Sequence, residues 1–367
     1  MAGPSVQDRI RAEFSVLQKE YSAFDRTLDA LAALRTILYD VEEIKQETRL
    51  IDFRPRLTAA DLDVEVYTPD GLIVLDGADF VLELKTSWND KDINQIIKYA
   101  KSPSYVLSDD RTQPFRSARC VLLGYQNPPG EQNLEKLFDS WKLRNFGFPL
   151  VVFRYSLEQG SEGDRMYFSR VPYGRNGECP SSHLGKALNS PRGFPVSAES
   201  FKAHRLKFHK ANDQVIASYA AVLWWTRYAG HYLSEEQKSE MAERGRLTSP
   251  LILTIDQIDS VPTPPDVEVP LGSRDVRRAL EFLRQARLVD LKARHKVFEV
   301  ELKEDRYIRL PQESPVPRTG SQIDISTKIL ARWASHKVKK PIGKPKKSKT
   351  RSARRVRDRQ TGWLFDR

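Results

Sequence analysis

Two short motifs supply the residue types that metal-dependent hydrolysis needs. Pro69-Asp70 is followed, after twelve residues, by Glu83-Leu84-Lys85. The two carboxylates are hard oxygen ligands of the kind that Mg²⁺ prefers, and the Leu84 carbonyl can serve as a further ligand. A bound divalent ion polarises a phosphodiester and lowers the pKa of a bound water, and Lys85 is placed to orient that water or to neutralise charge developing on the phosphate. We therefore expect a Mg²⁺ site, in which Mn²⁺ can substitute.

A hairpin is expected to bring these acids together. Residues 71–75 and 79–87 read as two strands, separated by an Asp-Gly-Ala turn. In the second strand, alternation puts Phe80, Leu82 and Leu84 on one face and Glu83 with Lys85 on the other. Pairing about the turn sets the first residue of the first strand roughly opposite Glu83. Asp70 should therefore lie beside Glu83.

Other acids compete for these roles. Asp61 and Asp63 share the polar face of the strand DLDVEV, but they need a longer hairpin and rank behind Asp70. Residues 265–266 and 301–303 spell the same motif with 34 residues between them, and we interpret that pair as part of a strand in a second domain. A solvated acid–base pair on a surface hairpin remains the competing interpretation of the main motif.

A helix after the hairpin adds two polar residues. Gln95 and Tyr99 lie four apart on one face of the helix expected over residues 92–101. The order PD, ELK and QIIKY resembles the PD-(D/E)xK nuclease superfamily, and is closest to its RecB-like and Holliday-junction-resolvase-like branches. The resemblance covers roughly residues 25–170. It implies a restriction-endonuclease-like core, in which a mixed sheet is flanked by helices.

The resemblance also implies a role for each motif residue. Asp70 and Glu83 would be metal ligands and Lys85 would be catalytic. Gln95 and Tyr99 would steady the site or the nucleic-acid strand.

Nucleases of this superfamily usually add an acid from the first core helix. Apolar residues recur at helical spacing over residues 5–22 and again over 25–48, which predicts two helices. On the second, Glu42 lies about 90° from the centre of the apolar stripe, at the rim of the core. We choose Glu42 for this role, with Glu47 and Glu13 in reserve.

Helical and strand patterns alternate along the rest of the chain. They predict an α/β domain over residues 1–171, a linker over 172–197 and a helical segment over 198–249. Within residues 250–310 an Arg-rich helix precedes a two-stranded hairpin with a basic tip, the outline of a winged helix. A flexible basic tail should follow over 311–367.

The net charge is concentrated in that tail. Lys and Arg number 60 against 49 acids, which gives +11. Residues 337–359 hold seven Lys and five Arg against Asp358, so this segment alone carries 12 − 1 = +11. Its composition predicts a disordered arm that binds nucleic-acid phosphates through counterion release. A solubilising or localisation tail is the alternative.

The cations expected to contact DNA lie on the motif helix, the Arg-rich helix, the hairpin tip and the tail. They are Lys98, Arg274, Arg277, Arg278, Lys292, Arg294, Lys346, Lys347, Arg354 and Arg355. The terminal peptide Trp363-Leu364-Phe365 is expected to dock on a protein partner. A homodimer is left open.

Composition excludes several classes of protein. No apolar run approaches the roughly 18 residues of a membrane span, and the N-terminus lacks the apolar stretch of a signal peptide. Cys120 and Cys179 cannot form a disulfide framework or a cysteine-rich metal site. We expect a cytoplasmic protein, associated with the nucleoid or, in a eukaryote, located in the nucleus, and no membrane partner.

These features favour a Mg²⁺-dependent DNA nuclease, an endonuclease acting in restriction or phage defence, transposition or recombination. A non-catalytic DNA-binding or scaffold protein that keeps the nuclease fold is one alternative. An RNA-directed nuclease is another.

Overall fold

The computed structural model describes most of the chain, and its contacts divide the chain into two compact units. The described residues are 3–53, 55–58, 66–107, 111–116, 118–161, 163–171, 177–203, 212–244, 251–254, 257, 271–294, 297–302, 308–316 and 323–339. Unit 1 comprises residues 1–22, 211–265 and 270–367, and unit 2 comprises residues 23–210 and 266–269. The motif residues belong to unit 2.

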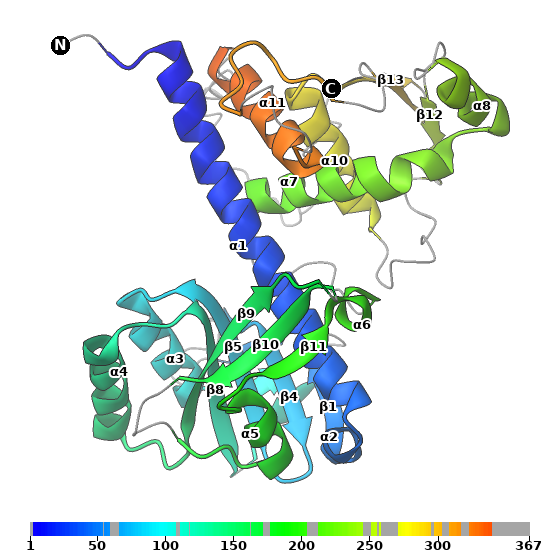
Figure 1. The fold of residues 1–367 in the computed structure, drawn as a ribbon. Coiled ribbons are helices and arrows are strands. Elements are labelled where there is room, and N and C mark those ends of the chain that lie inside the picture. Colours follow the sequence, from blue (N-terminus) through cyan, green and yellow to red (C-terminus); the bar gives the residue numbers. More distant parts are fainter. Residues whose placement is uncertain are drawn as a thin grey trace, which may run out of the picture. The chain divides into compact units, whose positions relative to one another are not determined.

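Unit 2 is built on a seven-stranded mixed sheet (Figure 1). Its order is β1-β4-β5-β8-β9-β10-β11, where β8 is parallel to both β5 and β9 and the other neighbours are antiparallel. The bounds are Thr48–Asp52 for β1, Gly71–Leu75 for β4, Asp79–Ser87 for β5, Arg119–Asn127 for β8, Leu150–Glu158 for β9, Arg165–Arg170 for β10 and Phe194–Ser197 for β11.

Six helices and a smaller antiparallel sheet complete the described part of unit 2. The helices are α1 (Val6–Asp40, which starts in unit 1), α2 (Glu42–Glu47), α3 (Lys91–Lys101), α4 (Glu131–Arg144), α5 (Ser182–Leu188) and α6 (Ala198–Ala203). The smaller sheet has the order β3-β2-β6-β7, with bounds Arg56–Thr58 for β2, Val66–Tyr67 for β3, Ser104–Val106 for β6 and Thr112–Pro114 for β7.

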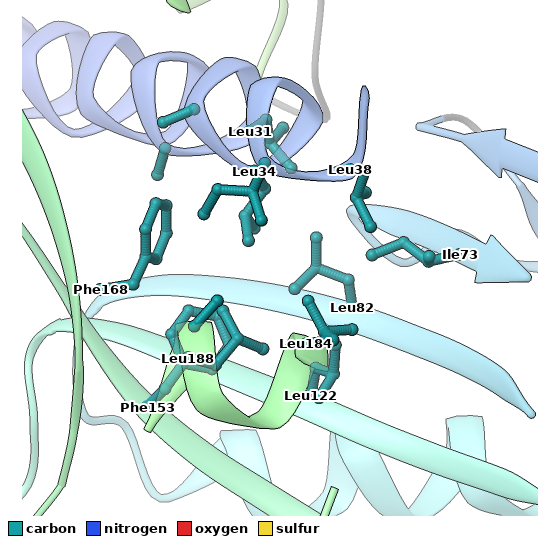
Figure 2. Packing of buried hydrophobic residues seen from close by; sticks show 14 of the residues in the cluster. Leu31, Leu34, Leu38, Ile73, Leu82, Leu122, Phe153, Phe168, Leu184 and Leu188 are labelled. Carbon is teal, nitrogen blue, oxygen red and sulfur yellow. The ribbon is translucent and has the colours of Figure 1, made fainter. Parts of the chain in front are cut away.

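Each face of the large sheet has its own apolar core. On one face Leu31 and Leu34 of α1 pack with Leu82 of β5 and with residues of α5 (Figure 2). On the other face Val81 of β5 belongs to a second cluster, with residues of α3 and α4. Because β5 is covered on both sides, its consecutive residues Phe80, Val81 and Leu82 are all buried. The predicted α/β class, a mixed sheet flanked by helices, is confirmed.

The sequence predicts two helices where the structure has the single helix α1. The expected break falls at Ala23-Phe24, which contains neither glycine nor proline, and Phe24 and Leu28 continue the buried stripe through it. The helix ends at Asp40, because Val41 takes an extended backbone with φ −81° and ψ 106°. The sequence places residues 42–47 in the last turns of the second predicted helix, but in the structure they form the separate helix α2.

The predicted linker over residues 172–197 is also wrong in part, since it contains α5 and β11. β11 pairs with β10 at the edge of the large sheet, and Leu184 and Leu188 of α5 are buried. Ser181 caps α5, because its Oγ accepts the Leu184 N–H at 3.2 Å. The sequence predicted a linker because Gly, Pro and Ser residues surround the few apolar positions of this short helix and strand. The first domain therefore extends beyond its predicted boundary.

Unit 1 contains a three-stranded antiparallel sheet with the order β12-β14-β13, and α10 packs against α7 and α11. Phe282 of α10 stacks on Trp333 of α11 with ring centroids 5.4 Å apart. The bounds are α7 Asp213–Leu223, η1 Trp224–Tyr228, η2 Ala229–Tyr232, α8 Glu235–Arg244, β12 Leu251–Thr254, α10 Ser273–Gln285, β13 Val289–Arg294, β14 Val297–Leu302 and α11 Ile325–Lys339.

The expected helix and hairpin are present as α10, β13 and β14, and β12 adds a third strand. The winged-helix assignment itself stays a prediction. The flexible tail predicted from residue 311 is wrong as far as Lys339, since α11 buries Ile329 and Trp333. Residues 340–367 lie outside the described part. None of the helices in the described ranges combines the length and apolar character that a membrane crossing requires.

Candidate active site

The hairpin of β4 and β5 places the two motif acids opposite each other. Gly71 pairs with Leu82 and Val74 with Asp79, so the ladder continues with Asp70 across from Glu83. This register differs by one residue from the expected one, because the turn closes over the two residues between Leu75 and Ala78. The shorter turn moves Asp70 into direct opposition with Glu83.

An ion pair between the buried Asp79 and the exposed Arg116 closes the turn end of this hairpin. Asp79 is completely buried and accepts the backbone N–H of Arg116 at 2.8 Å and its Nε at 2.7 Å. Arg116 also donates to the carbonyl oxygens of Asp76, at 3.0 Å, and Ala78, at 2.9 Å. One side chain thus holds the ends of both strands in register.

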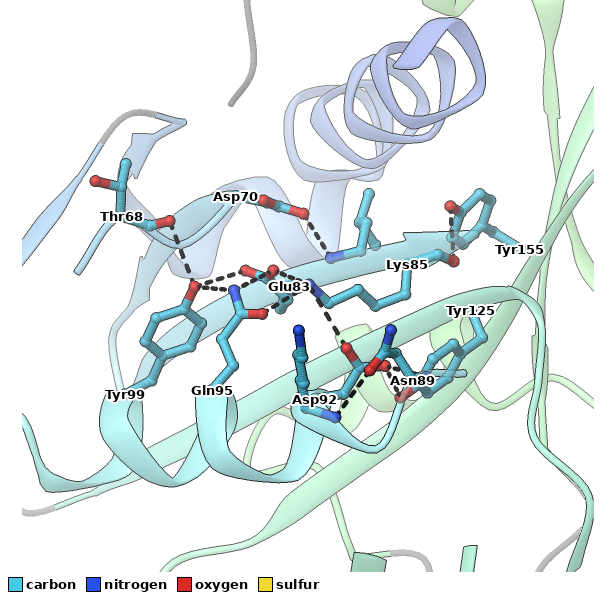
Figure 3. A network of polar contacts seen from close by, with 12 residues as sticks. Thr68, Asp70, Glu83, Lys85, Asn89, Asp92, Gln95, Tyr99, Tyr125 and Tyr155 are labelled. Atoms are coloured by element: carbon cyan, nitrogen blue, oxygen red, sulfur yellow. Dashed lines mark hydrogen bonds and ion pairs between the residues drawn. The ribbon is translucent and has the colours of Figure 1, made fainter. Parts of the chain in front are cut away.

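The carboxylate of Asp70 is held against the backbone of β5. The Asp70 N–H donates to the Leu82 carbonyl at 3.0 Å, and Asp70 Oδ2 accepts the Leu84 N–H at 2.6 Å (Figure 3). The side chain is only 2% exposed. The contact of Leu84 with Asp70 is thus made by its N–H. The role of the Leu84 carbonyl as a metal ligand stays a prediction.

Glu83 is the centre of a buried polar network between β5 and α3 (Figure 3). Its Oε1 accepts hydrogen bonds from Lys85 Nζ at 2.6 Å and from Gln95 Nε2 at 2.7 Å. Its Oε2 lies 3.1 Å from the hydroxyl of Tyr99. Gln95 also accepts from Lys85 Nζ at 2.8 Å and donates to the Tyr99 hydroxyl at 2.5 Å. The structure thus brings Glu83, Lys85, Gln95 and Tyr99 into direct contact.

The electrostatics of the network keep Lys85 charged. Burial by itself lowers the pKa of Lys85, but the charge and hydrogen bond of Glu83, with smaller contributions from Asp70 and Asp92, raise that pKa above its ordinary value. Burial and the charge of Glu83 likewise raise the pKa of Tyr99. Lys85 is therefore an ammonium ion at neutral pH and Tyr99 a neutral phenol.

Sequence reasoning missed Asp92 as a member of the site. Asp92 lies in the first turn of α3, where its Oδ2 accepts the Asn89 N–H at 3.0 Å. The same carboxylate lies 3.3 Å from the Tyr125 hydroxyl and 3.9 Å from Lys85 Nζ, and is 4% exposed. Burial raises its pKa. The only sequence signal was the Asn-x-x-Asp capping pattern, which says nothing about Lys85.

A further contact comes from β9. The hydroxyl of Tyr155 donates to the Lys85 carbonyl at 3.1 Å, and burial raises the pKa of this phenol. No local pattern links Tyr155 to the motif, since the contact depends on how β9 and β5 lie in the sheet.

The three acids expected from the first helix do not join this network. Glu42 is exposed and contacts Gln46 and Lys45. Glu47 accepts from Ser181 at 2.8 Å and pairs with His183, and Glu13 pairs with Lys337 in unit 1. The angular argument for Glu42 fails because the helix ends before it. Asp61 and Asp63 lie outside the described residues.

The donor set nevertheless fits Mg²⁺. Within the described ranges no group of three or more His, Cys, Asp and Glu side chains forms a metal site, but Mg²⁺ is commonly held by one or two carboxylates together with water. Asp70 and Glu83 supply that number. Taken with Asp92 and Lys85, they give three carboxylates and one ammonium, a formal charge of −3 + 1 = −2. A divalent cation would balance this charge.

The cations expected to contact nucleic acid are in varied settings. Lys98 is exposed, with Nζ 5.2 Å from the centre of the Tyr67 ring. Arg278 pairs with Asp213 at 2.9 Å, and Lys292 lies 3.6 Å from Glu299. The other two predicted cations whose side chains the structure describes are Arg274, which is exposed, and Arg277, which is half-buried. The Arg294 side chain, Lys346, Lys347, Arg354, Arg355 and the peptide at residues 363–365 lie outside what the structure describes.

The resemblance to PD-(D/E)xK nucleases rests on five motif residues, their order and their spacing. The structure adds that Glu83, Lys85, Gln95 and Tyr99 are in contact and that Asp70 bonds to the backbone between Glu83 and Lys85. Comparison of the chain with protein-family models, with curated proteins and with solved structures found no match.

Proposed function

We propose that the protein is a Mg²⁺-dependent nuclease that hydrolyses phosphodiester bonds in DNA, with its catalytic centre in unit 2. The observation that carries the proposal is the buried network in which Glu83 contacts Lys85, Gln95 and Tyr99 beside Asp70 (Figure 3). Buried carboxylates next to an ammonium are unfavourable for stability on their own, and such clusters concentrate at functional sites.

In this proposal Asp70 and Glu83 would hold the metal ion, with water as its further ligands. The ion would polarise a phosphodiester and lower the pKa of a bound water. Lys85, kept protonated by Glu83, neutralises negative charge that develops on the phosphate. Gln95 and Tyr99 fix the orientation of Glu83, and Gln95 also orients Lys85.

The test is a cleavage assay with the purified full-length protein. Plasmid, linear duplex, branched DNA, single-stranded DNA and RNA are each incubated with Mg²⁺, with Mn²⁺ and with EDTA. We expect DNA cleavage with either metal and none with EDTA, and the Lys85→Ala variant gives the background from contaminating nucleases. Cleavage of RNA alone would change the substrate class. No cleavage of any substrate with either metal would favour the non-catalytic alternative.

A further inference from the structure

The helix α3 carries three lysines that are exposed to solvent. They are Lys91, Lys98 and Lys101. Among the described residues none of their ammonium groups forms an ion pair. Asp92, the only acid within α3, is buried, and Asp90, just before the helix, accepts an indole N–H at 3.2 Å. The charge of these lysines is therefore not neutralised by a contact within the described part of the chain.

Two of the three lysines border the candidate active site. At about 100° per residue, Lys91 and Lys98 lie about 40° and about 60° from Gln95 around the helix axis, and Gln95 lies between them along the chain. Gln95 points into the polar network between β5 and α3 (Figure 3). Lys101 lies about 120° from Gln95 and so faces away from that network.

An aromatic ring restrains one of the two bordering lysines. Lys98 Nζ lies 5.2 Å from the centre of the Tyr67 ring. Tyr67 in β3 is half-buried, and its ring centre is 6.5 Å from that of Tyr99, whose hydroxyl contacts Glu83. An aromatic ring attracts an ammonium but carries no charge, so this contact restrains Lys98 without neutralising it. Such a restraint lowers the entropy that the side chain loses when it binds a ligand.

The separation of Lys91 and Lys98 suits the backbone of one nucleic-acid strand. Seven residues of α-helix span about 10.5 Å. One strand of duplex DNA carries a phosphate about every 3.4 Å along the axis, so the two lysines are about three phosphate steps apart. A strand that follows α3 from one lysine to the other passes Gln95, and with it the acids that the proposed metal ion requires.

We propose that Lys91 and Lys98 bind phosphates of the cleaved DNA strand on either side of the scissile phosphate, and that Tyr67 positions Lys98 for this contact. The inference rests on the proposed function for the choice of DNA and for the position of the scissile phosphate. Contacts to the backbone carry no sequence information, so binding at these lysines does not depend on base sequence. They are present in the ground state and the transition state alike, so they act on KM rather than on kcat.

The experiment measures binding of the full-length protein to a labelled duplex of about 20 base pairs between about 0.1 M and 0.5 M salt, in EDTA so that no cleavage occurs. The variants are Lys91→Gln, Lys98→Gln and the two combined. Lys101→Gln is the matched control, because Lys101 is the third exposed lysine of the same helix and faces away from the site. Thermal unfolding is measured for each variant.

We expect each single lysine variant to weaken binding about eightfold at 0.1 M salt and to lower the salt slope by about 0.9, with both effects adding in the double variant. The Lys101→Gln control should bind as the wild type does. In Mg²⁺ the double variant should show a raised KM and an unchanged kcat, because uniform binding has been removed. All of these variants should unfold at the wild-type temperature, since the substituted side chains are exposed.

Two variants of Tyr67 test its positioning role. Tyr67→Leu removes the ring and should weaken binding about two- to fivefold, whereas Tyr67→Phe keeps the ring and should bind as the wild type does. When Lys98→Gln is already present, Tyr67→Leu should weaken binding no further, because it acts through Lys98. An equal loss from Tyr67→Leu with and without Lys98 would refute the positioning role.

Wild-type affinity and salt slope in the double lysine variant would overturn the proposal, and so would an equal loss in Lys101→Gln. Tighter binding of RNA than of DNA at these lysines would exclude DNA as the occupant. If the double variant binds normally and cleavage still depends on Lys85, the proposed nuclease activity stands without this contact. If binding depends on Lys91 and Lys98 but no substrate is cleaved in Mg²⁺ or Mn²⁺, the lysines bind nucleic acid and the proposed nuclease activity is contradicted.

Discussion

Lys85 is held from three sides, by Glu83, Gln95 and Asp92. We expect Lys85→Ala to reduce DNA cleavage by at least about 100-fold, the effect of removing one group that stabilises transition-state charge. DNA affinity in EDTA should change little. The matched control is Lys101→Ala, an exposed lysine at the end of α3. Equal cleavage rates for wild type and Lys85→Ala would refute the assignment of the site.

Asp92 lies 3.9 Å from Lys85 Nζ, and we expect it to be a positioning residue. Asp92→Asn keeps an oxygen for Asn89 and Tyr125 but removes the charge beside Lys85. Activity should fall about tenfold, mainly in kcat, as for groups that orient a catalytic residue. Stability at pH 7 should not fall, because burial raises the pKa of Asp92 and makes its charge unfavourable. Asp90→Asn is the control, and a parallel loss of stability and activity would indicate a structural role.

At the scale of elements, the β4–β5 hairpin depends on the pair of Asp79 and Arg116. Asp79→Ala removes the buried acceptor of the Arg116 N–H and Nε while the guanidinium itself stays partly exposed to water, and we expect the free energy of unfolding to fall by about 1–3 kcal/mol. Asp76→Ala in the same turn breaks only an exposed pair with Arg49, which should cost less than about 1 kcal/mol. Urea denaturation compares the two. Similar losses of stability in the two variants would show that the pair of Asp79 and Arg116 does not set the register.

Contacts of Glu47 with Ser181 and His183 join α2 to α5, and their contribution to stability should depend on pH. A hydrogen bond from His183, with a smaller contribution from Ser181, lowers the pKa of Glu47 below its ordinary value of 4.5. A carboxyl group with a lowered pKa stabilises the fold above its ordinary pKa, and this stability is lost as the pH falls through the lowered value. In the Glu47→Gln variant the melting temperature should therefore fall less steeply between about pH 5 and pH 3 than in the wild type. If the melting temperature of Glu47→Gln depends on pH in this range as that of the wild type does, Glu47 does not contribute to the loss of stability in acid.

Over the whole molecule, charge is divided between a nearly neutral body and a cationic end. Deleting residues 340–367 keeps α11 intact and removes ten Lys and Arg of the cationic run. We expect the salt slope of duplex binding to fall by about three to six, since each phosphate contact contributes about 0.9 and not all cations bind at once. Cleavage at saturating DNA should persist, because the motif residues lie in unit 2. A slope equal to that of the full chain would leave localisation or partner docking as the role of this segment.

The sequence by itself determined the features that depend on residues close together along the chain. Alternation along β5 separated Leu82 from Glu83 and Lys85, and a four-residue spacing on α3 aligned Gln95 with Tyr99. These patterns follow from the periods of strand and helix, which any window of the chain reveals. The α/β class and the meeting of the two motif acids were predictable for the same reason.

Tertiary structure decided what depends on distant segments. Asp92 and Tyr155 join the site only because α3 and β9 pack beside β5. Glu42 stays outside because α1 ends at Asp40, and β11 and α11 form because core positions on other elements receive their apolar residues. Such placements balance burial against chain entropy over the whole fold, so no local period predicts them.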